Sequence, residues 1–417
     1  MAEANESAGL PILIIGAGCS GLALAHGLHL KRIPYKLFEK DTSLAPRNGR
    51  DWGISFHWSR DMLASLIGDA KWSRINEALV DPYISAEEAI KVPLINGSTG
   101  EVINVMSTPD MRRVLRSRLR SLIADDVLDV QFGKALEHIS YADDGRSVTA
   151  YFADGAAETG CLVIGADGSQ SQVRSLLLGS ERASLTRLPL AATFVTASFS
   201  RERALWLRSQ HAYLNALYHP NNEMGMFALL DGKNRDAPES WRFSFYVSWR
   251  SPLEEQTEEV ASGMSVHERL LQFKGKSKDF ADPIRSCREW ISDDLEEVYW
   301  GGCANWDPSL PEHTWDNHGG LVTLIGDAAH PMTYHRGQGL NHSVADAFKL
   351  FEKLANVGIR SQKELIDAYE SEMRARGGEE VRLSEMNSFM VHDWDQVGQS
   401  PIVKRGMGYG SGNESKA

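Results

Sequence analysis

The sequence contains few cysteines, and they are not arranged as a metal site. The four of them are scattered, with no CxxC pair and no histidine at ligand spacing. Long apolar runs are also missing, because none approaches the ~20 residues that span a bilayer. Residues 1–9 are polar and acidic, which is not the composition of a secretory signal. We therefore expect a reduced, cytoplasmic protein without a metal ion or a membrane span.

Positive charge is scarce as well. The 417 residues include 44 Lys and Arg against 56 Asp and Glu, which gives a net charge of −12. A nucleic-acid partner requires a basic face, so none is expected. The hydrophobic content of 42% and the charged content of 24% are those of a globular protein, and the length allows two domains. The sequence does not decide between a monomer and a homodimer.

A glycine-rich turn between an apolar strand and a helix is the first positive signal. The strand is expected at 10–15, the GxGxxG turn at 16–21, and an Ala- and Leu-rich helix at 22–30. A second strand at 35–38 ends in an acidic residue about 20 positions beyond the glycines, where a carboxylate binds ribose hydroxyls. The pattern predicts a bound dinucleotide, and the carboxylate favours FAD or NAD over NADP, because it repels a 2′-phosphate. The candidate contacts are Gly16, Gly18, Ser20, Gly21, Glu39 and Lys40.

Two later strands also end in an aspartate. The buried strands expected at 161–164 and 321–325 are followed by Asp167 and Asp327, at the strand ends where open α/β sheets bind ligands. Beyond Asp327 come a loop, a turn with two glycines at 337–339, and a helix-like segment. Glycines before a helix start expose backbone N–H groups, and the helix dipole favours negative charge there. Either segment alone could also be an ordinary strand–loop–helix connection.

Two further segments combine arginines with apolar or aromatic residues. The segment 47–58, RNGRDWGISFHW, is either a surface loop leading into a buried strand or a segment that places Arg50 and Trp52 beside the reactive end of the cofactor. In the segment 111–122 the apolar positions follow helical spacing, and most of the arginines are expected on a solvated face. One of these arginines is a candidate for a charge-assisted contact with the pyrophosphate.

The composition changes between about 186 and 300. Several segments there alternate apolar and polar residues, which is typical of strands with one buried face. A run of such strands inside an α/β chain indicates an inserted second lobe. We expect a discontinuous nucleotide-binding domain at 1–185 and 290–395, a substrate lobe at 186–289 to which part of 75–110 can be added, and a flexible tail at 396–417.

Three motifs together resemble a known family. GAGCSG at 16–21 with Glu39, GADGSQSQVR at 165–174, and GDAAHPM…RGQGLN…DA at 326–347 have the order and spacing of group A flavoprotein monooxygenases, the single-component FAD-dependent aromatic hydroxylases and their natural-product relatives. The resemblance covers nearly the whole chain, and RDWGISFHW resembles a segment of the natural-product subgroup. It implies an α/β fold, with a Rossmann-like FAD-binding domain of the aromatic-hydroxylase (GR2) type, an inserted antiparallel β-sheet substrate lobe and C-terminal helices.

The resemblance also implies roles for individual residues. At one end of FAD, the glycines of 16–21 approach the pyrophosphate and Glu39 holds the adenosine ribose. Arg112 reaches the phosphates or the ribityl chain, and Asp167 with Gly168 supports the site. Asp327 binds a ribityl or pyrophosphate group. The residues that line the pyrimidine edge of the isoalloxazine are Gly337, Gly339, Leu340 and Asn341. Free N–H groups at that helix start would stabilise the negative charge of reduced flavin.

The chemistry implied by the resemblance is oxygen insertion in secondary metabolism. NADPH or NADH, a transient co-substrate, reduces the flavin; O2 adds at C4a, and the flavin C4a-hydroperoxide hydroxylates or epoxidises a hydrophobic aromatic, indolic or polyketide-like natural-product intermediate. One alternative is an FAD enzyme of the same fold that catalyses an oxidation, rearrangement or cyclisation without oxygen insertion. A second is an FAD-binding regulatory protein without turnover.

The sequence departs from the family pattern at one position near the flavin. Where the family has a proline close to the reactive face, this chain has Tyr334. Tyrosine restores a backbone N–H group and adds a bulky phenol. The change is either neutral for the loop, or Tyr334 shapes the substrate pocket or acts as acid or base. The candidate catalytic residues are Tyr334, His335 and Arg50.

Overall fold

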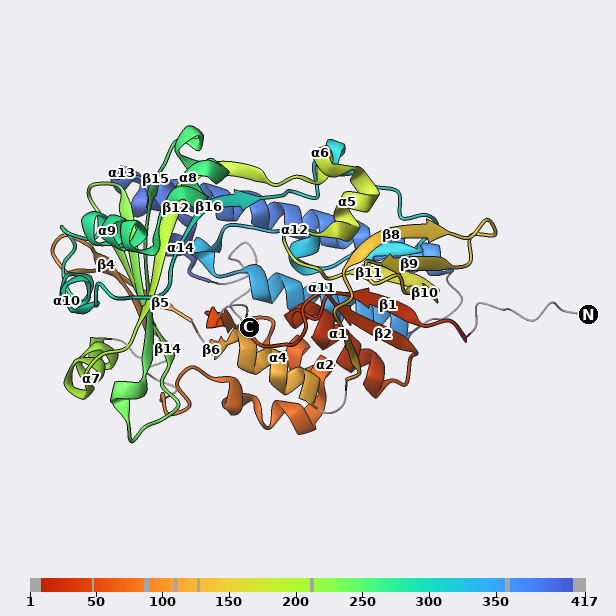
Figure 1. The fold of residues 1–417 in the computed structure, drawn as a ribbon, viewed down its shortest axis with the longest axis horizontal. Helices are drawn as coiled ribbons and strands as arrows, with labels where there is room; N and C mark the ends of the chain where they lie inside the picture. Colours follow the sequence, from red (N-terminus) through yellow and green to blue (C-terminus); the bar gives the residue numbers. More distant parts are fainter. Residues whose placement is uncertain are drawn as a thin grey trace, which may run out of the picture.

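The computed structural model describes residues 9–46, 49–85, 91–108, 111–125, 128–210, 214–356 and 361–407. Two lobes lie next to each other along the long axis of the molecule (Figure 1). One is built on a parallel sheet with helices, and the other on a larger, mostly antiparallel sheet. The long helix α12 (Gln362–Val391) extends from the first lobe towards the second. The observed fold is therefore the predicted α/β fold with an antiparallel second lobe.

The first lobe is organised around a five-stranded parallel sheet in the order β17-β11-β1-β2-β7. Strands β1 and β11 are buried at every position, which explains their uninterrupted runs of Ile, Leu and Val. Helix α1 contacts α2, α4 and α11 beside this sheet. The bounds are β1 Ile12–Ile15, β2 Tyr35–Glu39, β7 Val130–Phe132, β11 Leu162–Gly165, β17 Val322–Leu324, α1 Cys19–Leu30, α2 Arg60–Trp72, α4 Arg116–Ala124 and α11 Gly339–Ala355.

Two small sheets complete the first lobe. A three-stranded antiparallel sheet has the order β10-β9-β8, and β3 pairs with β6 in a two-stranded ribbon. Two short helices, α5 and α6, follow β11. The bounds are β3 Gly53–Phe56, β6 Arg112–Leu115, β8 Leu136–Tyr141, β9 Val148–Phe152, β10 Ala157–Gly160, α5 Gln172–Leu178 and α6 Ser180–Ala183.

The second lobe is a seven-stranded sheet in the order β16-β12-β15-β14-β13-β4-β5. Because side chains alternate along a strand, one face carries Val195, Phe227 and Phe245, whose cluster also contains residues of α7, α9 and α10. We call this the outer face. The opposite, inner face carries Phe194 and Tyr246 and belongs to a cluster with residues of the C-terminal helices. The bounds are β4 Lys91–Asn96, β5 Val102–Ser107, β12 Thr186–Ala197, β13 Leu214–His219, β14 Glu223–Asp231, β15 Arg242–Arg250, β16 Val298–Asn305, α7 Arg201–Gln210, α8 Glu258–Gly263, α9 Val266–Lys276 and α10 Ile284–Trp290.

This sheet extends beyond the lobe expected at 186–289. Strand β16 pairs with β12 on one side, and β4 pairs with β13 on the other. The C-terminal part also differs from the expected tail at 396–417. Helices α13 (Trp394–Val397) and α14 (Pro401–Arg405) follow α12, and Ile402 and Met407 are buried. The apolar side chains of this segment therefore cover the sheet up to Met407, and residues 408–417 lie outside the described part.

Two negative findings concern the described residues alone. None of their helices is both long and apolar enough to cross a bilayer. No three of their His, Cys, Asp and Glu side chains gather as metal ligands would, and all four cysteines are free.

Candidate dinucleotide and substrate site

The glycine loop after β1 is tight at two positions and open at a third. Gly16 has φ +107°, and a Cβ atom there would lie 2.4 Å from the Ala166 carbonyl oxygen. A Cβ atom on Gly21 would lie 2.1 Å from the Gly16 carbonyl oxygen, so both positions require glycine. At Gly18 the nearest atom would be 3.8 Å away. The loop therefore leaves its backbone at Gly18 accessible, as a dinucleotide pyrophosphate requires.

Glu39 is fixed at the end of β2 by backbone donors and by an arginine. Its two carboxylate oxygens accept hydrogen bonds from the N–H groups of Ala17 and Asp41, both at 3.0 Å. The buried guanidinium of Arg120 lies 3.7 Å from Glu39 and donates to the Ala17 carbonyl at 2.9 Å. Arg120, which the sequence analysis did not single out, thus links the glycine loop to the acidic residue. The predicted contacts Ser20 and Lys40 differ: Ser20 is buried next to Gly326, whereas Lys40 is exposed.

Asp327 lies where β17 ends and faces the start of α11. Its side chain is exposed, yet the surrounding protein raises its pKa, mainly through desolvation, while His330 and Arg116 act in the opposite direction. Both properties suit a carboxylate in a protein-lined recess. A Cβ atom on Gly339 would lie 4.0 Å from its Oδ1 atom. Since the first N–H groups of a helix have no acceptor within the helix, the backbone of Gly339, Leu340 and Asn341 presents donors close to Asp327.

The arginine segment 111–122 differs from the prediction of a single helix with a solvated arginine face. Arg112 begins strand β6, and its Nη1 atom donates to the Met111 carbonyl at 3.1 Å. The helix α4 begins only at Arg116, because β6 pairs with β3. Arg116 is the arginine whose charge acts on both Cys19 and Asp327. Arg116 is therefore a second candidate, besides Arg112, for a contact with the phosphates of a bound dinucleotide.

Asp167 has a local role in the structure. Its carboxylate accepts hydrogen bonds from the Ser171 hydroxyl at 2.5 Å and from the Gln172 N–H group at 2.7 Å, so it holds the start of α5. Gly168 follows with φ +82°. The buried Arg174 donates to the carbonyls of Ser169 and Ala328 and so ties this loop to the one that carries Asp327. That Asp167 and Gly168 support an FAD site stays a prediction.

Asn341 joins the glycine turn to the segment 47–58. Its buried Oδ1 atom accepts hydrogen bonds from the His57 N–H group at 2.9 Å and the Ser59 hydroxyl at 3.0 Å, and its Nδ2 atom donates to the Ser55 carbonyl at 3.2 Å. Trp58 donates through Nε1 to Gln338 at 3.0 Å. The two predicted segments are therefore brought together, although Arg47 and Asn48 lie outside the described residues.

Tyr334 forms part of an aromatic wall with the inner face of the sheet. Its ring centroid lies 5.6 Å from that of Phe194 and 5.5 Å from that of Tyr246, and its hydroxyl lies 3.9 Å from the Cys303 sulfur. The side chain remains 40% exposed. Enclosure by these neighbours nevertheless raises the pKa of the phenol well above its usual value, so it stays protonated at neutral pH. Such a surface suits a planar apolar compound.

His335 lies behind this wall. The imidazole is 5% exposed, with Nδ1 at 2.8 Å from the Ser388 hydroxyl and Nε2 at 3.4 Å from the Ser248 hydroxyl. Ser248 in turn lies 2.7 Å from Nε2 of the buried His392. Burial lowers the pKa of His335 well below its usual value. The neutral imidazole thus connects the Tyr334 loop to β15 and α12 and does not present itself to the pocket.

Arg50 and Trp52 lie at the other side of the wall. The Arg50 guanidinium is 3.3 Å from the ring centroid of Tyr299 on β16 and 4.9 Å from that of Trp52. Tyr299 is close to Phe194, with centroids 5.6 Å apart. The predicted neighbourhood of Arg50 and Trp52 is therefore an aromatic one, shared with the second lobe.

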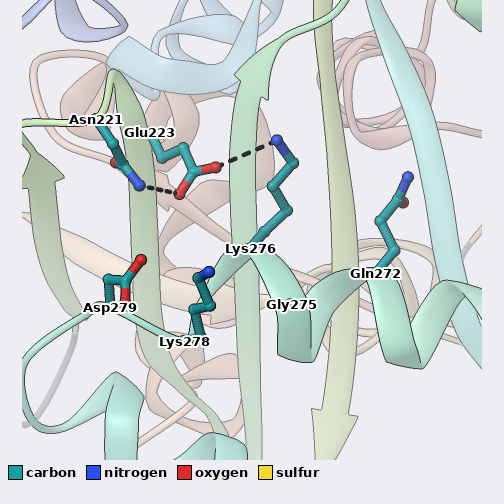
Figure 2. A pocket seen from close by; sticks show the side chains of 7 residues that line it. All are labelled: Asn221, Glu223, Gln272, Gly275, Lys276, Lys278 and Asp279. Carbon is teal, nitrogen blue, oxygen red and sulfur yellow. Dashed lines mark hydrogen bonds and ion pairs between the residues drawn. The ribbon is translucent and has the colours of Figure 1, made fainter.

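A separate hollow of about 400 Å³ opens near the outer face of the sheet, where α9 ends (Figure 2). One carboxylate in it is paired: Glu223 accepts a hydrogen bond from Asn221 at 2.8 Å and pairs with Lys276 at 3.2 Å. No polar group of the site described above lines it. The candidate site is therefore the recess around Asp327 together with the inner-face aromatic wall.

The fold and this site define a protein with a tight glycine loop and an aspartate at the carboxyl ends of a parallel sheet, next to an aromatic wall. Residues 312–384 match the family described as FAD binding domain. The chain is 34% identical over 404 residues to FAD-dependent monooxygenase phnB of Penicillium herquei, covering 95% of this chain and 94% of that protein. It is 33% identical over 401 residues to FAD-dependent monooxygenase cctM of Talaromyces islandicus, covering 95% and 96%. The chain belongs to the family of FAD-dependent monooxygenases.

Solved structures share the fold at lower identity. HpxO of Klebsiella pneumoniae, complexed with FAD and uric acid, has a TM-score of 0.70 at 20% identity, covering 93% of this chain and 90% of that one. The 2,6-dihydroxypyridine-3-hydroxylase from Arthrobacter nicotinovorans has a TM-score of 0.68 at 18% identity, covering 97% and 95%. The protein is thus an FAD-dependent oxidoreductase of the aromatic-hydroxylase fold, as the resemblance predicts, and FAD is its cofactor.

Proposed function

We propose that the enzyme uses NADPH or NADH and O2 to hydroxylate or epoxidise an aromatic, indolic or polyketide-like natural-product intermediate. The observation that carries this proposal is the exposed ring of Tyr334, set among Phe194 and Tyr246 and adjoining the glycine turn 337–339. A flat aromatic recess beside the flavin loop suits a planar substrate. Bound FAD supplies the reduced ring that activates O2, and the wall excludes water from the transfer.

The proposed roles of the residues follow their positions. We propose that Gly16, Gly18 and Gly21 face the pyrophosphate, that Glu39 holds the adenosine ribose, and that Arg116 and Asp327 bind the phosphate and ribityl region. The N–H groups of Gly339, Leu340 and Asn341 bind the pyrimidine edge. Tyr334 shapes the substrate pocket, whereas His335 positions its loop. We further propose that 1–185 and 290–395 supply most of the FAD-binding domain and that the sheet containing β12–β16 supplies the substrate lobe.

The proposal is tested by turnover with isotopically labelled oxygen. Planar phenols, indoles and polyketide-like aromatics are screened for faster oxidation of NADH or NADPH by the yellow holoprotein, and the products formed under ¹⁸O2 are analysed by mass spectrometry. One labelled oxygen atom per product molecule is expected. A product formed without label would instead favour the alternative of an oxidation or rearrangement. The observation that favours this alternative is Tyr334, which replaces the proline that the family has near the reactive face of the flavin. An NAD(P)H oxidation rate that no compound changes would contradict the proposal.

A further inference from the structure

Arg50 is a cation that lies over two aromatic rings. Its guanidinium stacks against Tyr299 and Trp52, at 3.3 and 4.9 Å from the ring centroids. Within the described ranges, no carboxylate lies at ion-pair distance from it. Stacking uses the faces of the guanidinium plane, so the N–H groups around its edge remain available for a planar anion.

Trp52 has a second cation as a neighbour. This cation is Arg116, whose guanidinium lies 5.5 Å from the centroid of the Trp52 ring. The charge of Arg116 acts on Asp327, at the end of β17. Arg50 instead contacts Tyr299, which belongs to β16 of the second lobe. The two arginines therefore point to two different ligands, and the phosphates of FAD account for only one of them.

The rings near Arg50 are continuous with the aromatic wall. Tyr299 lies 5.6 Å from Phe194, which lies 5.6 Å from Tyr334. Tyr299 and Tyr334 are 39% and 40% exposed, so both offer ring surface to a ligand. A planar compound that covers this wall would reach the Arg50 guanidinium at one end. The chain carries a net charge of −12, which repels anionic ligands. A local cation such as Arg50 would offset this repulsion and hold an anionic ligand on the wall.

We infer that Arg50 binds an ionised oxygen of the substrate, so that the substrate class is an acidic aromatic compound, a phenolate or a carboxylate. The inference rests on the proposed function, because it takes the aromatic wall to be the substrate site. It adds the charge of the substrate and the residue that selects it. The ring system covers Phe194 and Tyr334, and the anionic oxygen accepts charge-assisted hydrogen bonds from Arg50.

The test compares Arg50→Gln with a matched control. Arg203 also stacks on an indole, with its guanidinium 4.8 Å from the Trp290 ring, but it belongs to α7 and Trp290 packs on the outer-face cluster. Arg203→Gln therefore removes an equivalent stacked cation away from the wall. Both variants are prepared as FAD-loaded holoenzyme, and the flavin spectrum and flavin content must match the wild type. Binding is measured by titration calorimetry without NAD(P)H, so the readout does not depend on turnover.

Two pairs of probes separate charge from shape. The first pair is 2-naphthoate and its neutral isostere 2-naphthamide. The second is 4-nitro-1-naphthol, titrated at mildly alkaline pH where it is ionised, and its methyl ether. The wild type and Arg203→Gln are expected to prefer the anionic member of at least one pair by about tenfold, as one charge-assisted hydrogen bond gives. Arg50→Gln is expected to reduce that ratio to near one. The preference also falls as salt is added.

The outcomes distinguish the source of the anion and the fate of each proposal. A preference confined to the naphthoate pair assigns a carboxylate, and one confined to the naphthol pair assigns a phenolate. A preference that survives in Arg50→Gln overturns the inference, as does a wild type that binds neither anionic probe. If Arg50 governs charge preference but no ¹⁸O label enters any product, the proposed oxygen insertion fails while the anion site stands.

Discussion

Replacing Asn341 by alanine should reveal how strongly the glycine turn depends on the segment that carries His57. The Asn341 side chain is fully buried. It accepts hydrogen bonds from the His57 N–H group and the Ser59 hydroxyl and donates to the Ser55 carbonyl. Alanine removes these three bonds together with the two further contacts of Nδ2, to His57 Nε2 at 3.1 Å and to the Gly337 carbonyl at 3.4 Å. The hydroxyl of Ser59 can rotate, but the His57 N–H group and the Ser55 carbonyl lose these partners in a place where water is excluded.

The expected loss follows from those two backbone groups. A buried donor or acceptor without a partner costs about 1–3 kcal/mol, so the free energy of unfolding should fall by about 2–6 kcal/mol. FAD affinity should fall as well, because the backbone of Asn341 belongs to the start of α11, which we propose binds the pyrimidine edge of the flavin. If most of the loss in the free energy of unfolding appears only in saturating FAD, the bonds mainly support FAD binding. If the loss is equally large without FAD, they mainly support the fold.

The assay is urea unfolding in the absence and presence of saturating FAD, together with a titration of the apoprotein with FAD. Asn356→Ala is the matched control. Asn356 follows the other end of α11 and makes one side-chain bond, from Nδ2 to the Glu352 carbonyl at 2.9 Å, but it is solvent-exposed. It should change stability by less than about 0.5 kcal/mol. An Asn341→Ala protein as stable as Asn356→Ala, with unchanged FAD affinity, would refute the reasoning.

Three further predictions concern stability at acidic pH, the role of Arg120 in FAD affinity, and the role of the Tyr334 hydroxyl in product formation. Burial lowers the pKa of His57 and of His392 to about 4 and that of His335 well below normal, so the unfolded chain binds more protons below about pH 6.5. The free energy of unfolding should therefore fall as the pH drops from 6.5 towards 4, by up to ~1.4 kcal/mol per pH unit for each histidine; a pH-independent denaturation midpoint in this range would contradict this. Arg120→Met removes the bonds to Ala17 and Leu44 and should raise the Kd for FAD by about tenfold, whereas Arg146→Met in an exposed turn should not, and equal effects would exclude a specific role. Tyr334→Phe should leave FAD binding and flavin reduction unchanged but alter the product distribution. Identical products and rates would remove any role for the hydroxyl, which the raised pKa keeps protonated at neutral pH.

Much of the cofactor half was predictable because its signals are local. The GxGxxG turn, the acid after β2 and the Gly–Asp pair after β17 each lie within a few residues of the strand that positions them. Periodicity also identified β12–β15, since one face of each strand is buried. The prediction of a helix over 111–122 was wrong for its first residues, because strand β6 pairs with β3 there despite the helical spacing. Such pairing partners are distant in the sequence.

The glycine and acid pattern of the sequence predicted a bound dinucleotide, FAD or NAD, because tight turns and helix starts depend on glycine at fixed positions. The resemblance of three motifs to a known family then selected FAD. The sequence did not determine which arginine serves which ligand. Arg116 and Arg120 acquired their positions from the packing of α4 against α1, and Arg50 acquired its neighbours from β16, some 250 residues away along the chain. The aromatic wall likewise combines Tyr334 with side chains of β12 and β15. Such contacts between distant segments leave no periodic trace in the sequence, so only the tertiary structure decided them.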